Sequence, residues 1–422
     1  MNIGIIGGGL TGLTAALRLA QKGESVTVFE SSDSWGGLAS AYEIIPGVLI
    51  ERFYHHIFTN DRDILSLCAE LKISGKLKVL DGKTSHLYQG KIYPLDTPLT
   101  VLKFSPLSFF DRIRFGLVTL YLKLKTSPGY FDRVTAVAWL EKWYGKRAYG
   151  IVWQPLLRGK FAADYDKISM TWFWARVKKR TSKLIYPDGS FQVLITALTE
   201  EILRLRGSLR LGVNLESVMP EGNGWKVTVG GFPLYFDKLI TTTSLPTFLR
   251  MFPALPVLYR SQLASIKYLT AQVMVLVLKN RLSANYWMNV GETDFPFLVV
   301  GEQSNLFGTE YYKGRSVVYL GNYLMDTEAR LKMDEKELLA LYEPYLKKIN
   351  PRFETDWVEK VANFVGPFAQ PVVDLAYRDK IPPLPVPGYS NLFLATMAQV
   401  YPWDRGTNYS VKLANELVAQ FF

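Results

Sequence analysis

The chain has 422 residues, 48% of them hydrophobic and 21% charged, which is a globular composition long enough for two or three domains. No run approaches the roughly 20 apolar residues that span a bilayer, and the single cysteine, Cys68, excludes a disulfide within the chain and favours a reducing, cytoplasmic compartment. The net charge of +11 is concentrated between residues 101 and 183, which hold 17 Lys/Arg and 5 Asp/Glu, so one module carries the basicity.

The first thirty residues predict a βαβ unit. A short apolar strand is expected over 2–6, a tight turn over 7–12, a helix over 13–21 and a second strand over 25–29. Gly7, Gly9 and Gly12 occupy the positions of GxGxxG, where glycines give the tight turn, let the backbone approach a pyrophosphate and allow close helix–strand packing. Glu30 follows the second strand, where a carboxylate accepts hydrogen bonds from ribose hydroxyls. The unit predicts a dinucleotide site.

A second glycine pair, Gly36-Gly37, lies six residues beyond Glu30. Residues without side chains there let backbone amides approach the same pyrophosphate from its other side. This pair favours FAD over NAD, for which the first motif alone also fits.

The middle of the chain changes character. Residues 98–183 have helical spacing and five of the ten tryptophans, which predicts a helical insertion. Beyond it we expect a turn, a helix and strands that return to the first domain, at 186–190, 193–206, 209–218, 225–229 and 239–243. A second sheet domain and the C-terminal elements are expected at about 263–321 (strands), 334–348 (helix), 391–395 (strand), 402–408 (turn) and 409–422 (helix).

These motifs resemble a known family. Gly7-Gly-Gly-Leu-Thr-Gly12, Glu30 and Gly36-Gly37 resemble the N-terminal signature of the flavin-dependent amine oxidase superfamily, which includes protoporphyrinogen oxidases, phytoene-desaturase-like enzymes and UDP-galactopyranose mutases. The resemblance implies FAD bound in extended form, with its isoalloxazine between two domains.

The resemblance continues along the chain. The segment Tyr186-Pro-Asp-Gly-Ser-Phe-Gln192 with its following helix and strand is similar to the superfamily's mid-chain return, which implies a backbone contact of Leu215 on the adenine side. Residues 391–396 and 404–409 are similar to its C-terminal flavin motif, which implies a helix N-terminus near Thr407 directed at the flavin or its diphosphate. Gly406-Thr-Asn408 is also a good N-cap for any helix.

The expected fold is α/β: a discontinuous Rossmann-like FAD-binding domain of the glutathione-reductase type and a mixed-sheet substrate domain with a helical insertion. The expected boundaries are 1–50, 184–245 and 385–422 for the FAD-binding domain, 51–97 and 246–384 for the substrate domain, and 98–183 for the insertion. The predicted FAD-binding residues are Gly7, Gly9, Leu10, Thr11, Gly12, Glu30, Ser31, Gly36, Gly37, Leu38, Leu215, Gly406, Thr407 and Asn408.

Candidate catalytic residues are few. The sequence has three histidines, one cysteine and no metal-ligand spacing, so no metal site is predicted and the chemistry is assigned to the flavin. His55 and His56 lie in a segment that resembles the His-Ile-Phe segment of UDP-galactopyranose mutases. In this resemblance His56 matches the histidine that faces the flavin in the mutases, and Thr59 occupies the position of a further histidine of the mutases. A histidine there can orient a substrate, donate a hydrogen bond to the flavin or carry a proton. The alternative is a pair of ordinary strand residues.

Three further side chains are candidates. Arg158 and Lys160 can clamp a carboxylate or a diphosphate, or can belong to a solvated basic turn. Tyr401 can wall a substrate cavity or be core. The segment Gly301-Glu-Gln-Ser-Asn305 resembles a recurring segment of protoporphyrinogen-oxidase-like proteins and has no role that the sequence reveals.

Three functions fit these features. In the first, hydride moves from a bulky, anionic small-molecule substrate to N5 of FAD. In the second, a reduced flavin isomerises a nucleotide sugar, as in UDP-galactopyranose mutases, without net turnover of electrons. In the third, the fold is a non-catalytic scaffold like the GDP-dissociation inhibitors, which the intact glycines and Glu30 argue against. The sequence favours the first.

The basic insertion includes an amphipathic run with Phe109, Phe110, Ile113, Leu117, Leu120, Tyr121 and Leu124. With its positive charge, the run suits peripheral association with an anionic membrane surface, a lid over an anionic substrate, or an ordinary helical bundle. No reader motif accompanies the charge, so no nucleic-acid partner is expected.

Overall fold

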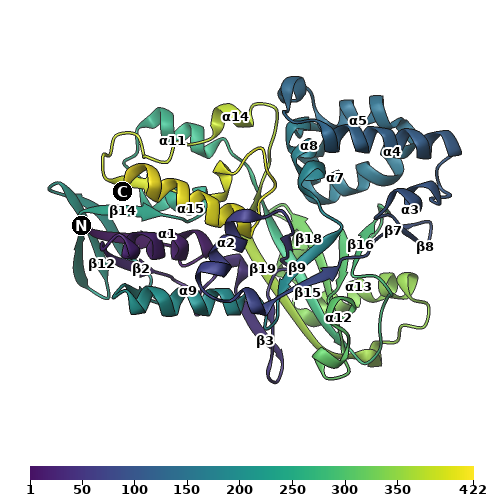
Figure 1. Cartoon of the computed structure of the whole chain (residues 1–422), viewed down its shortest axis with the longest axis horizontal. Helices are drawn as coiled ribbons and strands as arrows, with labels where there is room; N and C mark the ends of the chain where they lie inside the picture. Colours follow the sequence, from purple (N-terminus) through teal and green to yellow (C-terminus); the bar gives the residue numbers. More distant parts are fainter. The chain divides into compact units, whose positions relative to one another are not determined.

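The structure is a computed structural model that describes residues 1–422, and its packing divides them into two compact units (Figure 1). Unit 1 comprises residues 1–78, 185–267 and 378–422, and unit 2 comprises residues 79–184 and 268–377. Residues 51–78 and 246–267 therefore pack with the βαβ unit, whereas the sequence placed them in a substrate domain. The two units are defined by contacts between residues, which carry no information about ligands. The assignment of a substrate domain therefore stays a prediction.

Unit 1 is built on a five-stranded parallel sheet in the order β10-β2-β1-β14-β20. Its strands are β1 (Asn2–Ile6), β2 (Ser25–Phe29), β10 (Ser208–Arg210), β14 (Lys238–Thr241) and β20 (Leu392–Leu394). Ile6 pairs with Thr241, and Thr241 pairs with Leu394, so the carboxyl ends of β1, β14 and β20 meet at one edge of the sheet. The loops that follow β1 and β20 begin at that edge, which is where open parallel sheets bind ligands.

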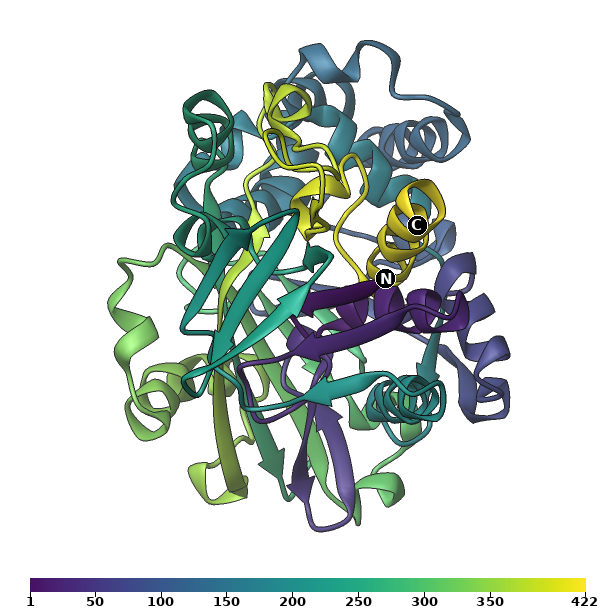
Figure 2. The same cartoon turned by 90° about the vertical axis from the view of Figure 1, so that its left-hand side faces the viewer.

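The helices of unit 1 bury apolar faces around this sheet. Helix α1 (Leu10–Gln21) packs against α9 (Gln192–Arg204) and α15 (Thr407–Phe421), and α15 packs against α2 (Arg62–Glu70). Figure 2 shows the yellow C-terminal helix beside the purple helix that follows the first strand. The unit also contains the shorter helices α10 (Leu245–Met251) and α11 (Val257–Ala264), while α14 (Tyr377–Lys380) lies at the boundary.

Smaller antiparallel elements complete unit 1. One is the three-stranded sheet of β11 (Ser217–Glu221), β12 (Gly224–Val229) and β13 (Phe232–Phe236), and another is the hairpin of β3 (Ala41–Ile45) and β4 (Val48–Glu51). The single strand predicted over 209–218 is wrong. The structure has β10 in the parallel sheet, then an irregular stretch, then β11 in the antiparallel sheet, because the two halves pair with different partners.

Unit 2 is built on a seven-stranded mixed sheet in the order β19-β15-β18-β17-β16-β7-β8, whose only parallel pair is β16 with β7. Its strands are β7 (Thr84–Tyr88), β8 (Lys91–Pro94), β15 (Tyr268–Leu278), β16 (Trp287–Val290), β17 (Val299–Glu302), β18 (Ser316–Leu324) and β19 (Val358–Pro371). The chain passes from unit 1 into unit 2 within β6 (Leu77–Asp81) and returns to unit 1 within β9 (Lys183–Pro187). The short strand β5 (Ile57–Phe58) belongs to unit 1.

Both faces of this sheet are covered, which explains why β15 is buried over nearly its whole length. On one face, Met274 and Leu276 share a core with Leu338 and Tyr342 of α13 (Glu335–Ile349). The other face carries the insertion, because helix α7 (Gln154–Phe161) packs against β18. A strand buried on both faces reads as a continuous apolar run, as the sequence of β15 does.

The insertion is helical, as predicted. It contains α3 (Pro98–Leu102), α4 (Phe109–Leu124), α5 (Ala136–Tyr144), α6 (Lys146–Ala148), α7 and α8 (Met170–Lys179), and α12 (Ser304–Phe307) follows later in the unit. Its interior is aromatic: the rings of Phe115 and Trp153 are stacked, with centroids 5.4 Å apart, and Tyr144 and Phe173 meet Trp153 edge-on. None of the helices has the length and apolarity needed to cross a membrane.

Candidate flavin site

The turn between β1 and α1 has the backbone that the three glycines predict. Gly7 has φ +113°, and its N–H donates to the Phe29 carbonyl oxygen at 2.9 Å. A β-carbon at Gly12 would lie 1.9 Å from the Gly7 carbonyl oxygen. Gly7 is therefore needed for its conformation and Gly12 for close approach of helix and turn, while Leu10 and Thr11 form the buried first turn of α1.

The second glycine pair lies directly against this turn. The N–H of Gly36 donates to the Gly8 carbonyl oxygen at 2.8 Å, and Gly9 forms a parallel β-bridge with Gly36. Gly36 and Gly37 have φ +107° and +58°. A β-carbon at Gly9 would have as its nearest neighbours only the Gly37 Cα at 3.9 Å and the Gly36 oxygen at 4.0 Å. At Gly9 the two loops thus meet through backbone atoms, while the Trp35 ring lies against Gly8.

Glu30 holds the first loop in place. Its carboxylate accepts hydrogen bonds from the N–H of Gly8 at 2.7 Å and from the N–H of Ser32 at 2.9 Å. Ser31 is exposed beyond it, and Leu38 is half-buried in the short 3-10 helix Gly37–Ala39. Leu215 is half-buried in the irregular stretch between β10 and β11, where the N–H of Val213 donates to the Glu30 carbonyl oxygen at 2.9 Å. These predicted residues therefore gather around the end of β2.

The N-terminus of α15 lies at the same end of unit 1 as that of α1. Arg18 Nε donates to Asn415 Oδ1 at 2.8 Å, and Lys22 Nζ donates to the Val418 carbonyl oxygen at 3.5 Å. Because the residue numbers increase together along α1 and α15, the two helices run parallel. Helix α15 begins after Gly406, and the Thr407 hydroxyl oxygen is buried without a hydrogen-bond partner. Two helix N-termini, each with N–H groups that lack intrahelical acceptors, thus lie at the carboxyl edge of the sheet.

The side chain of Asn408 makes two hydrogen bonds to α2. Its Oδ1 accepts from the N–H of Ile64 at 3.1 Å, and its Nδ2 donates to Asp63 Oδ2 at 3.2 Å, so it caps the first turn of α2. The side-chain amide is thus already bonded within the protein, and contact of Asn408 with the flavin stays a prediction. Only the backbone N–H of Asn408 remains for that purpose.

His55 and His56 lie in an irregular segment between β4 and β5, so the alternative that they are strand residues is wrong. The His55 ring donates from Nδ1 to the Phe53 carbonyl oxygen at 2.6 Å and meets the Phe191 ring edge-on at 5.9 Å. Burial lowers the pKa of His55 to about 4; the bond to Phe53 opposes this, and the nearby Arg405 adds to it. The ring is therefore neutral at pH 7, with its second nitrogen an acceptor.

His56 is half-buried, and its ring meets that of Phe58 edge-on with centroids 5.0 Å apart. The two histidines therefore have different ring partners, Phe191 for one and Phe58 for the other.

The structure adds a buried acid that the sequence did not single out. Glu51, the last residue of β4, is 1% exposed; its carboxylate accepts from the Tyr186 hydroxyl, and also from the N–H of Phe191 at 2.6 Å. Burial raises the pKa of Glu51 to about 7, against these hydrogen bonds. The available signal was a lone carboxylate at the end of the apolar strand 48–51. Because Phe191 also contacts His55, the acid and the histidine belong to one cluster.

Tyr409, in the first turn of α15, was also missed. Its hydroxyl is buried without a hydrogen-bond partner, and its ring is stacked on Trp403 with centroids 6.1 Å apart. Burial, with Asp61 and other nearby carboxylates, raises the pKa of Tyr409 far above its ordinary value, so the phenol stays protonated. The predicted Tyr401 is half-buried, with the Arg378 guanidinium carbon 5.6 Å from its ring centroid.

Arg158 and Lys160 both lie in α7 of unit 2, but not on one face. Two residues apart on a helix, they point in nearly opposite directions. Arg158 is exposed, 4.8 Å from the ring centroid of Tyr165, whereas Lys160 is only 8% exposed, with Nζ between the rings of Trp172 and Tyr323. The structure therefore corrects both the idea of a joint clamp and that of a solvated turn.

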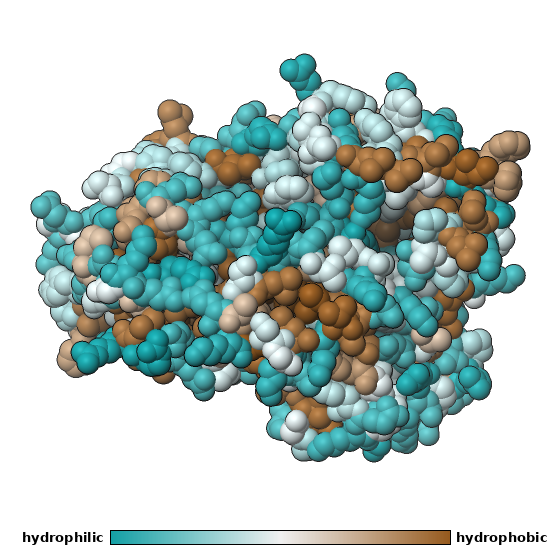
Figure 3. All heavy atoms as spheres, in the orientation of Figure 1, coloured by the Kyte–Doolittle hydropathy of each residue, from teal (hydrophilic) through white to brown (hydrophobic).

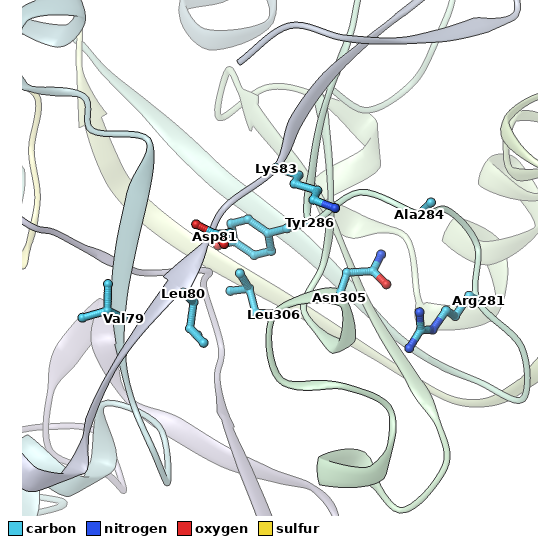
Figure 4. A pocket seen from close by; sticks show the side chains of 9 residues that line it. All are labelled: Val79, Leu80, Asp81, Lys83, Arg281, Ala284, Tyr286, Asn305 and Leu306. Carbon is cyan, nitrogen blue, oxygen red and sulfur yellow. The ribbon is translucent and has the colours of Figure 1, made fainter. Parts of the chain in front are cut away.

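The segment 301–305 has a structural role in unit 2. Buried Glu302 accepts from the N–H groups of Leu282 and Ser283 at 3.1 and 2.6 Å and from two serine hydroxyls, and Asn305 donates to the carbonyl oxygens of Ser283 and Asn285. Together they tie the loop 281–286 to α12. An open cavity with a volume of about 490 Å³ lies beside this loop. Figure 4 shows the side chains that line it: Val79, Leu80, Asp81, Lys83, Arg281, Ala284, Tyr286, Asn305 and Leu306.

Comparison with known proteins gives the family. The family model of flavin containing amine oxidoreductases matches residues 10–402, which is most of the chain. The chain therefore belongs to this family of flavin-dependent enzymes, and the resemblance deduced from its motifs is confirmed. A 4,4'-diapophytoene desaturase from Staphylococcus haemolyticus is 49% identical over 43 residues, which are 10% of this chain and 9% of that protein.

Solved structures of low sequence identity share the whole fold. A provisionally assigned protoporphyrinogen oxidase from Exiguobacterium sp. 255-15 is 17% identical and aligns over 99% of this chain and 98% of its own, with a TM-score of 0.79. A reduced UDP-galactopyranose mutase is 16% identical and aligns over 99% of this chain and 94% of its own, with a TM-score of 0.77. A putrescine oxidase with bound putrescine is 15% identical and aligns over 99% of this chain and 98% of its own, with a TM-score of 0.73. At such identities the likeness shows a mixed α/β fold like that of these enzymes and does not choose among their reactions.

Proposed function

We propose that unit 1 is a discontinuous, Rossmann-like FAD-binding domain of the glutathione-reductase type, and that the chain is an FAD-dependent oxidoreductase. The observation that carries the proposal is the contact between two glycine loops at the carboxyl edge of a parallel sheet, with two helix N-termini at the same end. The residues present fit the cofactor: no side chain separates Gly9 from Gly36 and Gly37, and the buried Thr407 hydroxyl lacks a partner inside the protein.

The roles of individual residues follow from these positions. The backbone N–H groups of the two glycine loops and of the first turn of α1 would hold the pyrophosphate. Glu30 lies at the end of β2, where its carboxylate can exchange a backbone donor for ribose hydroxyls. The first turn of α15 and the Thr407 hydroxyl would hold the flavin end, where the positive helix dipole favours negative charge. A bound flavin supplies the hydride acceptor.

For substrate, we propose a bulky, anionic small molecule, with the exposed Arg158 among its binding residues. Neutral His55 can accept a hydrogen bond from a substrate N–H or O–H group, whereas a pKa of about 4 makes it a weak base. Glu51, with a pKa of about 7, is the carboxyl in this cluster that can take up or release a proton near neutral pH. His56 stays the candidate for direct contact with flavin or substrate.

A second candidate is the flavin-dependent isomerisation of a nucleotide sugar. It is favoured by the segment His56-Ile-Phe58, which resembles that of UDP-galactopyranose mutases. The missing second histidine at Thr59 and the segment Arg405-Gly-Thr-Asn408, which resembles the oxidase-type motif, argue for oxidation. In either case the buried Cys68 takes no part in the reaction, because burial raises the pKa of its thiol to about 12. We also propose a reducing, cytoplasmic location.

The test is to purify the protein and record its visible spectrum, then to mix it anaerobically with porphyrinogens, amines, polyenes and UDP-sugars. Bleaching of the flavin by one substrate in the dark, followed by recovery with an electron acceptor, is the expected result. Product formation only after dithionite reduction, with no electrons consumed, would favour the isomerase instead. A colourless protein that cannot be reconstituted with FAD would refute both.

A further inference from the structure

Helix α4 exposes an unusually apolar surface on the outside of the helical insertion. Seven of its side chains point outward and are between 39% and 80% exposed: Phe109, Phe110, Ile113, Leu117, Leu120, Tyr121 and Leu124. We name this set of side chains the α4 face. Leu99 and Leu102 of the adjacent α3 are also exposed, at 60% and 45%. Figure 3 shows this surface as a brown band across the outer side of the insertion, where α3 and α4 lie.

The α4 face is not the exposed edge of a buried core. At about 100° per residue, its seven side chains fall within an arc of about 120°. Phe115 and Leu122, which are buried at 5% and 0% exposure, lie on the opposite side of the same helix. A helix at a protein surface ordinarily turns polar side chains outward, and α4 is apolar on both sides. Patches of this kind mark interaction sites.

Positive charge borders the α4 face. Residues 99–147 contain nine Lys/Arg and three Asp/Glu. Lys103 at the end of α3 and Lys142 on α5 are exposed, and both of these helices pack against α4. Arg147 is exposed as well and donates to the Pro106 carbonyl oxygen in the loop before α4, and Arg133 and Lys146 are exposed elsewhere in the insertion. Of the acids, Asp111 lies in the first turn of α4, where its carboxylate bonds the Ser108 hydroxyl, and no acidic residue belongs to the α4 face.

Two of the three basic side chains of α4 are held at the sides of the helix. Arg112 donates to the carbonyl oxygens of Leu107 and Leu102, and Arg114 donates to those of Trp143 and Lys142. Their guanidinium groups therefore flank the apolar arc and do not interrupt it. Trp143, which is 44% exposed on α5, lies beside Arg114.

We propose that the α4 face docks on an anionic lipid bilayer, with α4 parallel to the membrane plane. A continuous row of Phe, Leu and Ile flanked by cations matches the two layers of such a surface, because the apolar row can enter the acyl boundary while the cations meet the phosphates. The flanking charge would repel an identical basic face on a second copy, so the bilayer is favoured over self-association. Helix α4 has 16 residues and lies on the membrane without crossing it.

Vesicle flotation of the full-length protein as purified tests the proposal. The probe is unilamellar vesicles of phosphatidylcholine with 30% phosphatidylserine, compared with pure phosphatidylcholine, at low and at physiological salt. We expect flotation with the anionic vesicles that weakens by at least about fivefold in bound fraction as salt rises, because the Debye length shortens to about 8 Å. Absence of flotation with anionic vesicles at low salt would overturn the proposal.

A variant with a matched control locates the contact. F110S/L117S removes two outward side chains that are 80% and 63% exposed, and V257S/L258S removes two equally apolar side chains of α11 that are 78% and 87% exposed. We expect the first variant to lose at least about tenfold in vesicle affinity and the second to bind like the wild type. Equal binding by all three proteins would overturn the assignment of the face, as would light scattering that shows a wild-type dimer dissociated by F110S/L117S.

A measurement on the unaltered protein keeps the proposal testable if F110S/L117S fails to fold. Brominated lipids quench tryptophan fluorescence only at short range, and Trp143 lies at the border of the α4 face. We expect quenching in brominated anionic vesicles that is reduced in Trp143→Phe. Flotation without any quenching would place the contact elsewhere and refute the α4 face as the docking surface.

Discussion

Gly9→Ala separates cofactor binding from folding more sharply than any other substitution in the site. Gly9 has φ −73° and ψ 176°, which alanine adopts without strain. The new β-carbon would meet its nearest neighbours at 3.9 and 4.0 Å, which is ordinary van der Waals contact. We therefore expect the free energy of unfolding of the apoprotein to change by no more than about 0.5 kcal/mol.

The same methyl group would occupy the space between the two glycine loops, where we expect the pyrophosphate. If it breaks one charge-assisted hydrogen bond from a backbone N–H, the loss is about 1.5–3 kcal/mol, which corresponds to a dissociation constant for FAD about 10 to 150 times higher. Fluorescence titration of the apoprotein with FAD measures this constant, and urea denaturation of the same samples measures stability.

Two alanine variants frame this result. Gly75→Ala, at a glycine with no atom within 4 Å of the added carbon, should leave both quantities unchanged. Gly12→Ala, whose β-carbon would lie 1.9 Å from the Gly7 oxygen, should destabilise the apoprotein itself. The reasoning is refuted if Gly9→Ala binds FAD like the wild type, or if it loses as much stability as Gly12→Ala.

Three further predictions concern the buried polar groups of unit 1. Burial raises the pKa of Glu51 from 4.5 to about 7 in the folded chain, so between these pH values the folded chain binds a proton that the unfolded chain has lost. The free energy of unfolding should therefore fall by on the order of 3 kcal/mol as the pH rises through this range. Urea denaturation of wild type and Glu51→Gln at pH 5 and pH 8 checks this, and an unchanged difference between the two proteins would contradict it. His55 has the opposite sign: with its pKa lowered from 6.5 to about 4, the unfolded chain binds the extra proton between these values, so this contribution to stability is lost as pH falls. Histidine NMR should show no titration of His55 above about pH 5, and a midpoint near 6.5 would disprove its burial. Tyr409→Phe removes a hydroxyl that has no partner within the protein, so apoprotein stability should stay within about 0.5 kcal/mol, whereas the dissociation constant for FAD should rise about two- to tenfold if that hydroxyl bonds the cofactor. Wild-type affinity for FAD in this variant would remove Tyr409 from the site.

The parts of the site that the sequence predicts are those with local causes. The turn Gly7–Gly12 and the pair Gly36-Gly37 act through their own backbone, so their spacing is enough to predict both the turn and the approach of the loops. The family follows from the same glycines, and the family model confirms it.

Other roles depend on contacts that spacing along the chain cannot reveal. Asn408 caps a helix that begins 346 residues earlier, at Arg62, and Glu51 bonds Tyr186, which lies 135 residues further along the chain. Lys160 reads as one of two cations in a basic segment, yet the helix turns it inward against Trp172 and Tyr323. In each case the partner is brought near by the tertiary fold, so only the structure separates a ligand contact from a structural one.

The division of unit 1 into three separate segments has a consequence for biosynthesis. Strand β14 pairs with β20, and α1 packs against α15, so residues 378–422 supply both an edge of the parallel sheet and a helix that covers α1. Until the ribosome releases those residues, β14 presents an unpaired edge and α1 an uncovered apolar side, which are the features that nascent chains expose to chaperones. The two glycine loops can form early, but the second helix N-terminus joins them only after residues 378–422 have been made, so stable capture of the cofactor waits for that segment.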